Sequence, residues 1–414
     1  MPQSTQAPEM NGLYYFSDTP DRVSDRIHLI SAFGNSTCIE TEDGLVIVDA
    51  CVRTMGPRLL EQIRRLSDKP IRYVIYTHGH FDHAFGVWSL LEEAEQRGLP
   101  RPVLVAHQKV PERFDRYREL AGQHDHINRI QFALPPELKV VEEEAFFYPD
   151  VTYADRMLLR VGELTLRLHH AMGETDDATW VWIPERRTVC TGDLFLWSCP
   201  NIGNPFKVQR YEVEWADALE AMAALEPEAL APGHGPAIRG VAEVRAACLD
   251  TARALRWLHD EVVRRLNAGQ WAEQILAEVN SLPADLAGKP YLRPIYGCPT
   301  FVVHGILRRY GGWFDGNPSH LFPSRTAAIA REILQLSNVD RVLRRARELR
   351  ENDVQLALHL VDLVIDGADS TRRTEALQLK SELLQVRADR EPSFIARNIF
   401  RNGAARAAAE AQNS

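Results

Sequence analysis

Three histidines and one aspartate are crowded into six residues of the sequence, the run His-Gly-His-Phe-Asp-His at positions 78–83. Neutral imidazole is a ligand for zinc and other first-row divalent metals, and an added carboxylate allows a second, harder site. His78 and His80 are alternate residues that can point at one metal, while Asp82 and His83 turn toward another. A polar turn that happens to be rich in histidine is the alternative, but so dense a motif favours metal binding.

The elements around this motif predict that it lies in a functional loop. Residues 71–76 form an apolar run typical of a buried strand, and the spacing over residues 58–66 predicts a helix leading into it. Loops at strand ends are where functional residues collect in α/β folds. Asp49 closes an earlier buried strand and can orient the metal loop by hydrogen bonds, with a turn-capping role as a close alternative.

Three later stretches also place ligand-type side chains just past a strand or in a tight turn. They are the run 169–177 with two histidines, Asp193 after a strand over 188–192, and His234 between two glycines. A lone histidine in such a turn is ordinarily only a turn residue. Their recurrence within one domain favours a shared site.

The stretch from residue 112 to residue 149 is rich in Arg, His, Asn and aromatic residues and has no clear strand period. We interpret it as an inserted lid or substrate loop. Within it, His124, Asp125 and His126 have ligand-type side chains, but a solvated loop is the favoured interpretation of so short a polar run.

Length and composition set limits on the class of protein. A chain of 414 residues predicts two or three domains, and a formal charge of −9 argues against nucleic acid as a partner. Residues 1–11 are polar and lack the apolar core of a secretory signal, and no run of about 18 apolar residues occurs. We therefore expect a cytoplasmic location and no membrane association.

The motif at 78–83, together with His170, Asp193 and His234 in the expected order, resembles the metallo-β-lactamase superfamily over residues 25–240. The resemblance implies an α/β fold, the αβ/βα sandwich of four layers, with two metals at its edge. It assigns His78, His80 and His170 to the first metal, Asp82, His83 and His234 to the second, and Asp193 to both. His170 is preferred to His169 because it stands three residues before Gly173, as in the family's motif.

From residue 241 the pattern becomes helical, and the run Trp-Phe-Asp-Gly-Asn-Pro at 313–318 precedes a series of amphipathic helices. Most of residues 245–400 resemble the dimerisation region of alkylsulfatases of the metallo-β-lactamase type, which implies a homodimer. We expect a leader over 1–24, a catalytic domain over 25–243 with the inserted lid, and an all-α dimerisation domain over 244–414. The sterol-carrier-like domain that full-length alkylsulfatases append is not expected.

These features predict a hydrolase that uses two divalent ions, most simply Zn²⁺. Two such ions lower the pKa of a bridging water from about 15.7 toward 7, and the hydroxide attacks an ester. Asp82 can also hold or shuttle the nucleophile's proton. The C-terminal resemblance favours an alkyl sulfate, an anionic ester with an apolar part, which gives alcohol and sulfate. Lys207 and Arg210 are candidates for binding the anion, with ordinary exposed basic residues as an equal alternative.

Other functions stay open. The resembling sulfatases place Glu where this chain has His170 and Asp193, so another ester, a lactone or a phosphoester also fits the ligand set. Diiron oxygen reductases of the same fold carry Glu at the position of His80, and no flavin domain is visible, which disfavours a redox role. A non-catalytic interaction protein built on the C-terminal helices is the remaining alternative.

Overall fold

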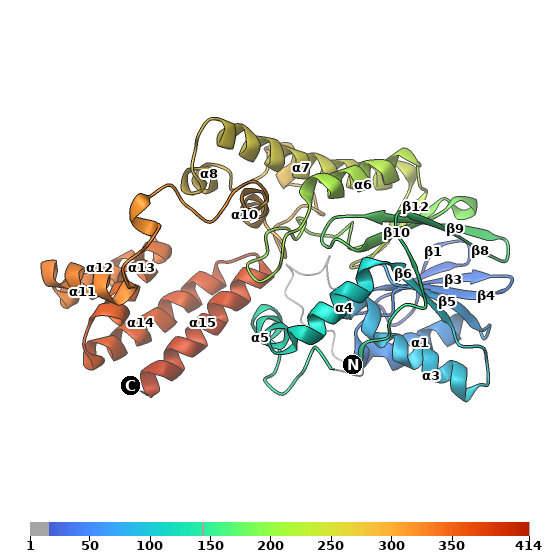
Figure 1. Ribbon diagram of the computed structural model, residues 1–414, viewed down its shortest axis with the longest axis horizontal. Helices are drawn as coiled ribbons and strands as arrows, with labels where there is room; N and C mark the ends of the chain where they lie inside the picture. Colours follow the sequence, from blue (N-terminus) through green and yellow to red (C-terminus); the bar gives the residue numbers. More distant parts are fainter. Residues whose placement is uncertain (1–15, 143–144, 414) are drawn as a thin grey trace. The chain divides into compact units, whose positions relative to one another are not determined.

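A computed structural model describes residues 16–142 and 145–413 of the chain (Figure 1). It forms two compact units. The first contains the described residues up to Asp125 and from Lys139 to Gly311, and the second contains His126–Leu138 and the chain from Gly312 onward. Most of the leader predicted over 1–24 lies outside the described residues.

Two sheets form the centre of the first unit. Among the described residues, the first sheet has seven strands in chain order, antiparallel from β1 to β4 and parallel from β4 to β7. Its strands are β1 (Asp21–Ser24), β2 (Ile27–Ile30), β3 (Ser36–Thr41), β4 (Gly44–Val48), β5 (Ile71–Ile75), β6 (Val103–His107) and β7 (Val151–Tyr153).

The second sheet has six strands within the described residues, in the order β13-β12-β11-β10-β9-β8. Its neighbours are antiparallel except for the parallel pair β11 and β12. Its strands are β8 (Arg156–Val161), β9 (Leu164–Ala171), β10 (Ala178–Ile183), β11 (Thr188–Gly192), β12 (Ala229–Pro232) and β13 (Ile238–Arg239).

Alternating side chains on the strands explain why the sheets pack face to face between helices. On β4, Val46 lies in the core shared by the two sheets, whereas Ile47 packs with residues of α1 (Gly56–Leu66) and α3 (Trp88–Gln96). On β10, Trp182 packs against α6 (Glu212–Ala224) and α7 (Val241–Asn267). Figure 1 shows the sheets between these helix pairs. The predicted αβ/βα sandwich is confirmed.

The first part of the segment interpreted as a lid is helical, whereas its described residues from 133 onward contain no α-helix. It forms α4 (Lys109–Glu119) and α5 (Ala121–Phe132). Helix α4 buries Val110, Arg113, Phe114 and Tyr117, which recur at helical spacing on one face. The segment lacks a strand period because its apolar residues follow a helical period instead. Its role as a lid stays a prediction.

Several shorter elements complete the first unit. Helices α8, α9 and α10 place side chains in the same core as α6 and α7, so this compact unit extends to Gly311. The predicted domain limit between residues 243 and 244 stays a prediction. The shorter elements are η2 (Arg53–Met55), α2 (Phe81–Ala84), η3 (Phe85–Val87), η5 (Pro184–Arg186), α8 (Ala272–Glu278), α9 (Ala284–Ala287) and α10 (Pro299–Tyr310).

The second unit is built from helices, as predicted for the C-terminal region. Four of its helices begin with a capping side chain that accepts a hydrogen bond from the backbone N–H three residues later. The capping residues are Asn338, Asp353, Asp369 and Ser393. Its elements are η6 (Pro318–His320), α11 (Thr326–Leu336), α12 (Val339–Leu349), α13 (Val354–Gly367), α14 (Ser370–Asp389) and α15 (Phe394–Gln412). Over residues 16–142 and 145–413, no helix combines the length and the apolar character needed to cross a membrane.

Candidate metal centre

Two groups of ligand-type side chains lie close together at the ends of central strands in the first unit. Within each group, one potential ligand atom of every residue lies within 4.8 Å of the others. The first group is His78, His80 and Asp193, and the second group is Asp82, His83 and His234. Six of the seven predicted metal ligands are thus brought together, three in each group.

The parallel pairing of β11 and β12 explains how Asp193 and His234 meet, because the carboxyl ends of parallel neighbours lie at one edge of a sheet. The backbone N–H of Gly233 donates to the carbonyl of Gly192 over 2.9 Å. A Cβ atom on Gly233 would lie 2.3 Å from Asp193 Oδ1, so glycine is required for this close approach.

The carboxylate of Asp193 faces both groups. Its Oδ2 lies 3.7 Å from Nε2 of His78 in the first group. Its Oδ1 lies 3.3 Å from Nε2 of His83 and 3.5 Å from Nε2 of His234 in the second. One oxygen directed at each group is the arrangement that a bridging carboxylate requires.

Asp49 orients two of the histidines. Its Oδ2 accepts hydrogen bonds from Nδ1 of His83 and Oγ1 of Thr77, each over 2.7 Å, and its Oδ1 accepts from the Thr77 N–H over 2.6 Å. Thr77 Oγ1 lies 3.0 Å from Nδ1 of His78. Asp49 has a φ of 64°, an uncommon conformation for this residue type that these bonds hold in place. Both rings therefore direct Nε2 toward the site.

The two groups differ in their electrostatic surroundings. Burial and the neighbouring His83 lower the pKa of His78 to about 4, and burial with His78 holds the pKa of His80 well below its ordinary value. Burial acts in the same direction on His234, but the carboxylates of Asp193 and Asp82 outweigh it and raise its pKa to about 9. The imidazoles of the first group are neutral, which is the form that binds metal.

The donor atoms of this centre fit divalent cations. Among the described residues, the buried atoms Nε2 of His83 and Oδ1 of Asp193 have no well-formed hydrogen bond. Unsatisfied buried polar atoms cost free energy, and a cation held between them would satisfy both. Imidazole nitrogens and carboxylate oxygens together suit zinc and other first-row divalent ions.

His170, the seventh predicted ligand, belongs to neither group. It lies at the end of β9, where its Nε2 is 2.9 Å from the carbonyl oxygen of Asp176. Its ring stacks on His107 with a centroid distance of 3.7 Å. His169 stacks instead on Trp180, at 4.1 Å. The assignment of His170 to the first metal stays a prediction.

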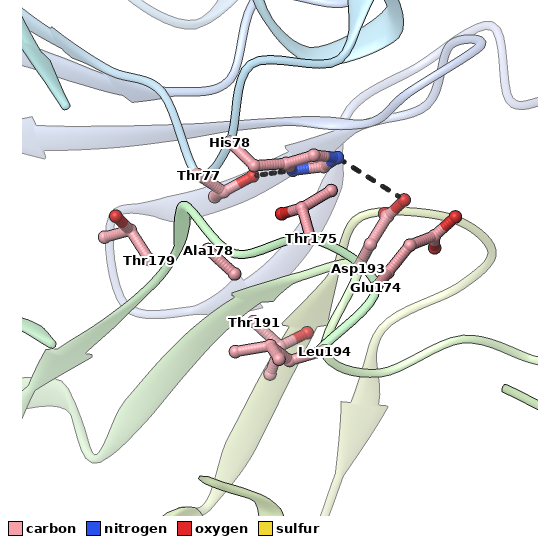
Figure 2. A pocket seen from close by; sticks show the side chains of 9 residues that line it. All are labelled: Thr77, His78, Glu174, Thr175, Ala178, Thr179, Thr191, Asp193 and Leu194. Atoms are coloured by element: carbon pink, nitrogen blue, oxygen red, sulfur yellow. Dashed lines mark hydrogen bonds and ion pairs between the residues drawn. The ribbon is translucent and has the colours of Figure 1, made fainter. Parts of the chain in front are cut away.

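Glu174 is a residue that the sequence argument did not select. Figure 2 shows it in a pocket that is also lined by His78 and Asp193. Its Oε1 accepts hydrogen bonds from Arg210 and, over 2.8 Å, from Nδ2 of Asn201. Burial raises the pKa of Glu174 despite the adjacent Arg210, and Asp193 adds to the effect. The available signal was a Gly-Glu-Thr turn directly after the strand that ends at residue 171.

The two predicted anion-binding residues have different surroundings. Arg210 is buried, and its guanidinium already donates to Glu174 and to the carbonyl of Asn201. Lys207 is half-buried, and burial together with the charge of Arg210 lowers the pKa of Lys207 to about 7. Lys207 therefore suits anion binding better than Arg210.

The lid histidines do not form a further metal site. His124 packs its ring against Tyr117 with a centroid distance of 4.3 Å. Asp125 Oδ1 accepts the backbone N–H groups of Val140 and Val141. Within residues 16–142 and 145–413, the ligand-type clusters are the two groups described above.

Two family models match the chain. The metallo-beta-lactamase superfamily model matches residues 31–234, which include both ligand groups, and the alkyl sulfatase dimerisation model matches residues 272–410. This chain carries a metallo-beta-lactamase domain and an alkyl sulfatase dimerisation domain. The resemblance inferred from the motifs is confirmed.

Curated relatives of the chain are alkylsulfatases. A linear primary-alkylsulfatase from Pseudomonas is 28% identical, over 72% of this chain and 60% of the relative. An alkyl/aryl-sulfatase from Saccharomyces cerevisiae is 24% identical, over 92% of this chain and 63% of the relative. The chain thus spans about three fifths of the length of these curated relatives.

Among solved structures, the stereoselective inverting sec-alkylsulfatase Pisa1 from Pseudomonas matches with a TM-score of 0.82 at 22% identity. The match covers 94% of this chain and 65% of that chain. A match at this identity shows a shared fold, which here includes both the sandwich and the C-terminal helices.

Proposed function

We propose that this chain is a metal-dependent hydrolase of sulfate esters that converts an alkyl sulfate into an alcohol and sulfate. The observation that carries the proposal is the combination of a two-group metal centre with an alkyl sulfatase dimerisation domain in one chain. The curated alkylsulfatases that match it support the same substrate class. A lactone or phosphoester substrate is the second candidate, favoured by the histidine-rich ligand set.

We propose Zn²⁺ as the ion at both groups, because imidazole and carboxylate donors suit it. Bound divalent ions supply Lewis acidity and a hydroxide nucleophile at neutral pH. We also propose Glu174, in place of His170, as a further ligand of the first group. The support is its buried carboxylate in the pocket that His78 and Asp193 line. Arg210 would then hold and orient that carboxylate.

The remaining residues have proposed roles in binding and proton transfer. Asp82 holds or shuttles the proton of the nucleophile, since its buried carboxylate lies within the second group and can accept a proton there. Lys207 binds the sulfate group by a charge-assisted hydrogen bond. The positive charge of Lys207 matches an anionic ester.

The proposal is tested by assaying the purified, zinc-loaded chain against alkyl sulfates, aryl sulfates, lactones and phosphodiesters. We expect sulfate release from alkyl sulfates that is lost in the His78→Ala, His80→Ala double variant. Turnover of lactones or phosphodiesters alone, by a folded and metal-loaded chain, would establish the second candidate instead. Reaction in heavy-oxygen water shows whether the label enters the alcohol or the sulfate, and hence which bond breaks.

We propose that a second copy of this chain covers an apolar face of α11. On its packed side, α11 buries Ala330 against α13, where a Cβ atom on Gly367 would lie 2.9 Å from the Ala330 carbonyl carbon. The other side exposes apolar residues at helical spacing, and the segment before it exposes more. These residues are Ile329, Ile333 and Leu336 on α11, and Trp313, Leu321 and Phe322 before it. Their location within the matched dimerisation domain supports a second copy as the partner.

The proposed setting of the reaction is the cytoplasm, with a small molecule as substrate. The formal net charge of −9 supports a small-molecule substrate over nucleic acid, whose phosphates would be repelled. Fractionation of cells that produce the chain would test the location.

A further inference from the structure

The backbone between two ligands of the first group is held by a carboxylate from the opposite sheet. Gly79, which separates His78 from His80, donates its N–H to Oδ2 of Asp177 over 3.0 Å. Asp177 directly precedes β10, and its side chain is completely buried. The contact therefore joins the ligand loop after β5 to the second sheet.

Asp177 is paired with a cation from α4. Nε of Arg113 donates to Oδ2 of Asp177 over 2.7 Å, and Nη2 donates to Oδ1 of Asp176 over 2.5 Å. Arg113 is only 5% exposed, because it lies on the buried face of α4 beside Phe114. Although burial opposes it, Arg113 holds the pKa of Asp177 below its ordinary value. The acceptor of the Gly79 hydrogen bond is thus a carboxylate that Arg113 of α4 keeps charged.

There is little space for this arrangement to shift. A Cβ atom on Gly79 would lie 3.0 Å from Cδ of Arg113 and 3.2 Å from Oδ2 of Asp177. Removing one member of a buried ion pair leaves an uncompensated charge, which the surroundings relieve by moving or by taking up a proton. Either response alters the bond to Gly79, and therefore the positions of His78 and His80.

We propose that Arg113 and Asp177 are positioning residues for the first ligand group, through which α4 sets the affinity of that group for a metal ion. The proposal rests on the metal-dependent function proposed above, although not on its substrate. The second group has a different direct anchor, since Asp49 binds Nδ1 of His83, whereas it reaches His78 only through Thr77. Loss of Arg113 should therefore weaken one of the two metal sites and not both equally.

The test compares metal binding by the full chain and its Arg113→Met variant during stepwise removal of zinc with a chelator. Elemental analysis counts the retained ions, and circular dichroism on heating checks that each variant is folded. Outer partners of metal ligands commonly contribute 10- to 100-fold to affinity. We expect Arg113→Met to lose one ion at a roughly 10- to 100-fold lower chelator concentration and to keep the other.

Reference variants identify the affected site and control for the loss of a surface charge. His78→Ala and His234→Ala mark the loss of the first and second groups. The ion that Arg113→Met retains should leave at the same chelator concentration as the ion that His78→Ala retains. Arg118→Met removes a guanidinium from the exposed end of the same helix and should keep both ions. If Arg113→Met does not fold, Asp177→Asn and Arg113→Lys are measured in the same way. In these variants we expect a smaller, still selective loss.

Equal weakening of both ions in a folded variant, or no weakening in any of the three, would overturn the proposal. Metal counting also separates its failure from that of the proposed function. A wild-type chain that binds two ions without releasing sulfate contradicts the sulfatase proposal alone. A wild-type chain that binds no divalent ion contradicts both.

Discussion

The two ligand groups use the same kinds of side chain but are supported by different parts of the molecule. The group of Asp82, His83 and His234 is anchored by Asp49, directly after the core strand β4. In the group of His78, His80 and Asp193, the two histidines lie in a loop that Asp177 and Arg113 hold from the second sheet and from α4. One anchor thus belongs to the sheet that carries the loop, and the other is supplied by the second sheet and α4.

The groups also differ in charge. The histidines of the first group are neutral because burial and their neighbours lower their pKa, so no proton competes with a cation there. In the second group, carboxylates keep the pKa of His83 and His234 above the ordinary value even though burial opposes this. Identical ligand types therefore differ in how they meet a cation, because the imidazoles of the first group are already neutral whereas those of the second must release a proton to the solvent when a cation binds.

The largest effect is expected from the residue that the two groups share. Asp193→Asn keeps the size of the side chain but removes the charge that faces His78 on one side and His83 on the other. We expect both ions to be lost on dialysis and turnover to fall at least about a thousandfold, because metal ions contribute several kcal/mol to such reactions. Elemental analysis and sulfate release measure the two effects. Retention of both ions would show that Asp193 does not join the groups.

A smaller and selective effect is expected from the anchor of the second group. Asp49→Asn weakens the acceptor that binds Nδ1 of His83 directly and reaches His78 only through Thr77, so affinity for the ion of the second group should fall about 10- to 100-fold and affinity for the other ion less. Chelator titration measures the fall, and His234→Ala provides the reference for loss of the second group. Asp43→Asn, in the exposed turn before β4, is the matched control and should bind both ions normally. Preferential loss of the ion at the first group would contradict the assignment of Asp49 to the second group.

A pH-dependent effect on KM is expected from Lys207, which lies outside both groups. Because its pKa is lowered to about 7, Lys207 is charged below this pH and loses its charge as the pH rises. KM for an anionic ester should therefore rise about tenfold between pH 6 and pH 9, the contribution of one charge-assisted hydrogen bond. The charged and titratable groups that act on Lys207 are Arg210, Glu174, Asp82, Arg113 and His124.

Lys207→Arg is the variant that tests this prediction, because guanidinium stays charged throughout that range. KM of Lys207→Arg should stay nearly constant from pH 6 to pH 9, and KM of Lys207→Met should be high at every pH. Steady-state kinetics at several pH values give KM separately from kcat. The same rise in KM for the arginine variant would exclude Lys207 as its source.

The smallest effect on the metal centre is expected from the second unit. Ile333→Glu places a charge on the exposed apolar face of α11 and should convert the proposed dimer to monomers, because burying an unpaired charge is costly. Sedimentation velocity measures the change, and metal content should stay at two ions. Gln335→Glu adds the same charge at another exposed position of α11 and should remain dimeric. A monomeric wild-type chain would contradict the proposed partner.

The sequence by itself determined the ligand types and the elements that carry them. The apolar run at 71–76 and the strand before Asp193 were predictable because buried strands have local signatures in composition and period. The short strand β12 before His234 was not predicted, since the sequence there indicated a glycine-bracketed turn after a helix. The motif at 78–83 with the later ligand-type residues in order indicated the superfamily, and the run at 313–318 with the helices after it indicated the dimerisation region. Each motif is a run of a few residues, which is visible along the chain.

Only the tertiary structure decided which distant side chains meet. Gly79 and Asp177 are 98 positions apart, and their hydrogen bond depends on how the two sheets pack. The same packing places Glu174 in the pocket beside Asp193, engages Arg210 with Glu174, and leaves His170 stacked on His107. The direction of each side chain is set by sheet pairing and helix docking, and no local pattern in the sequence encodes either.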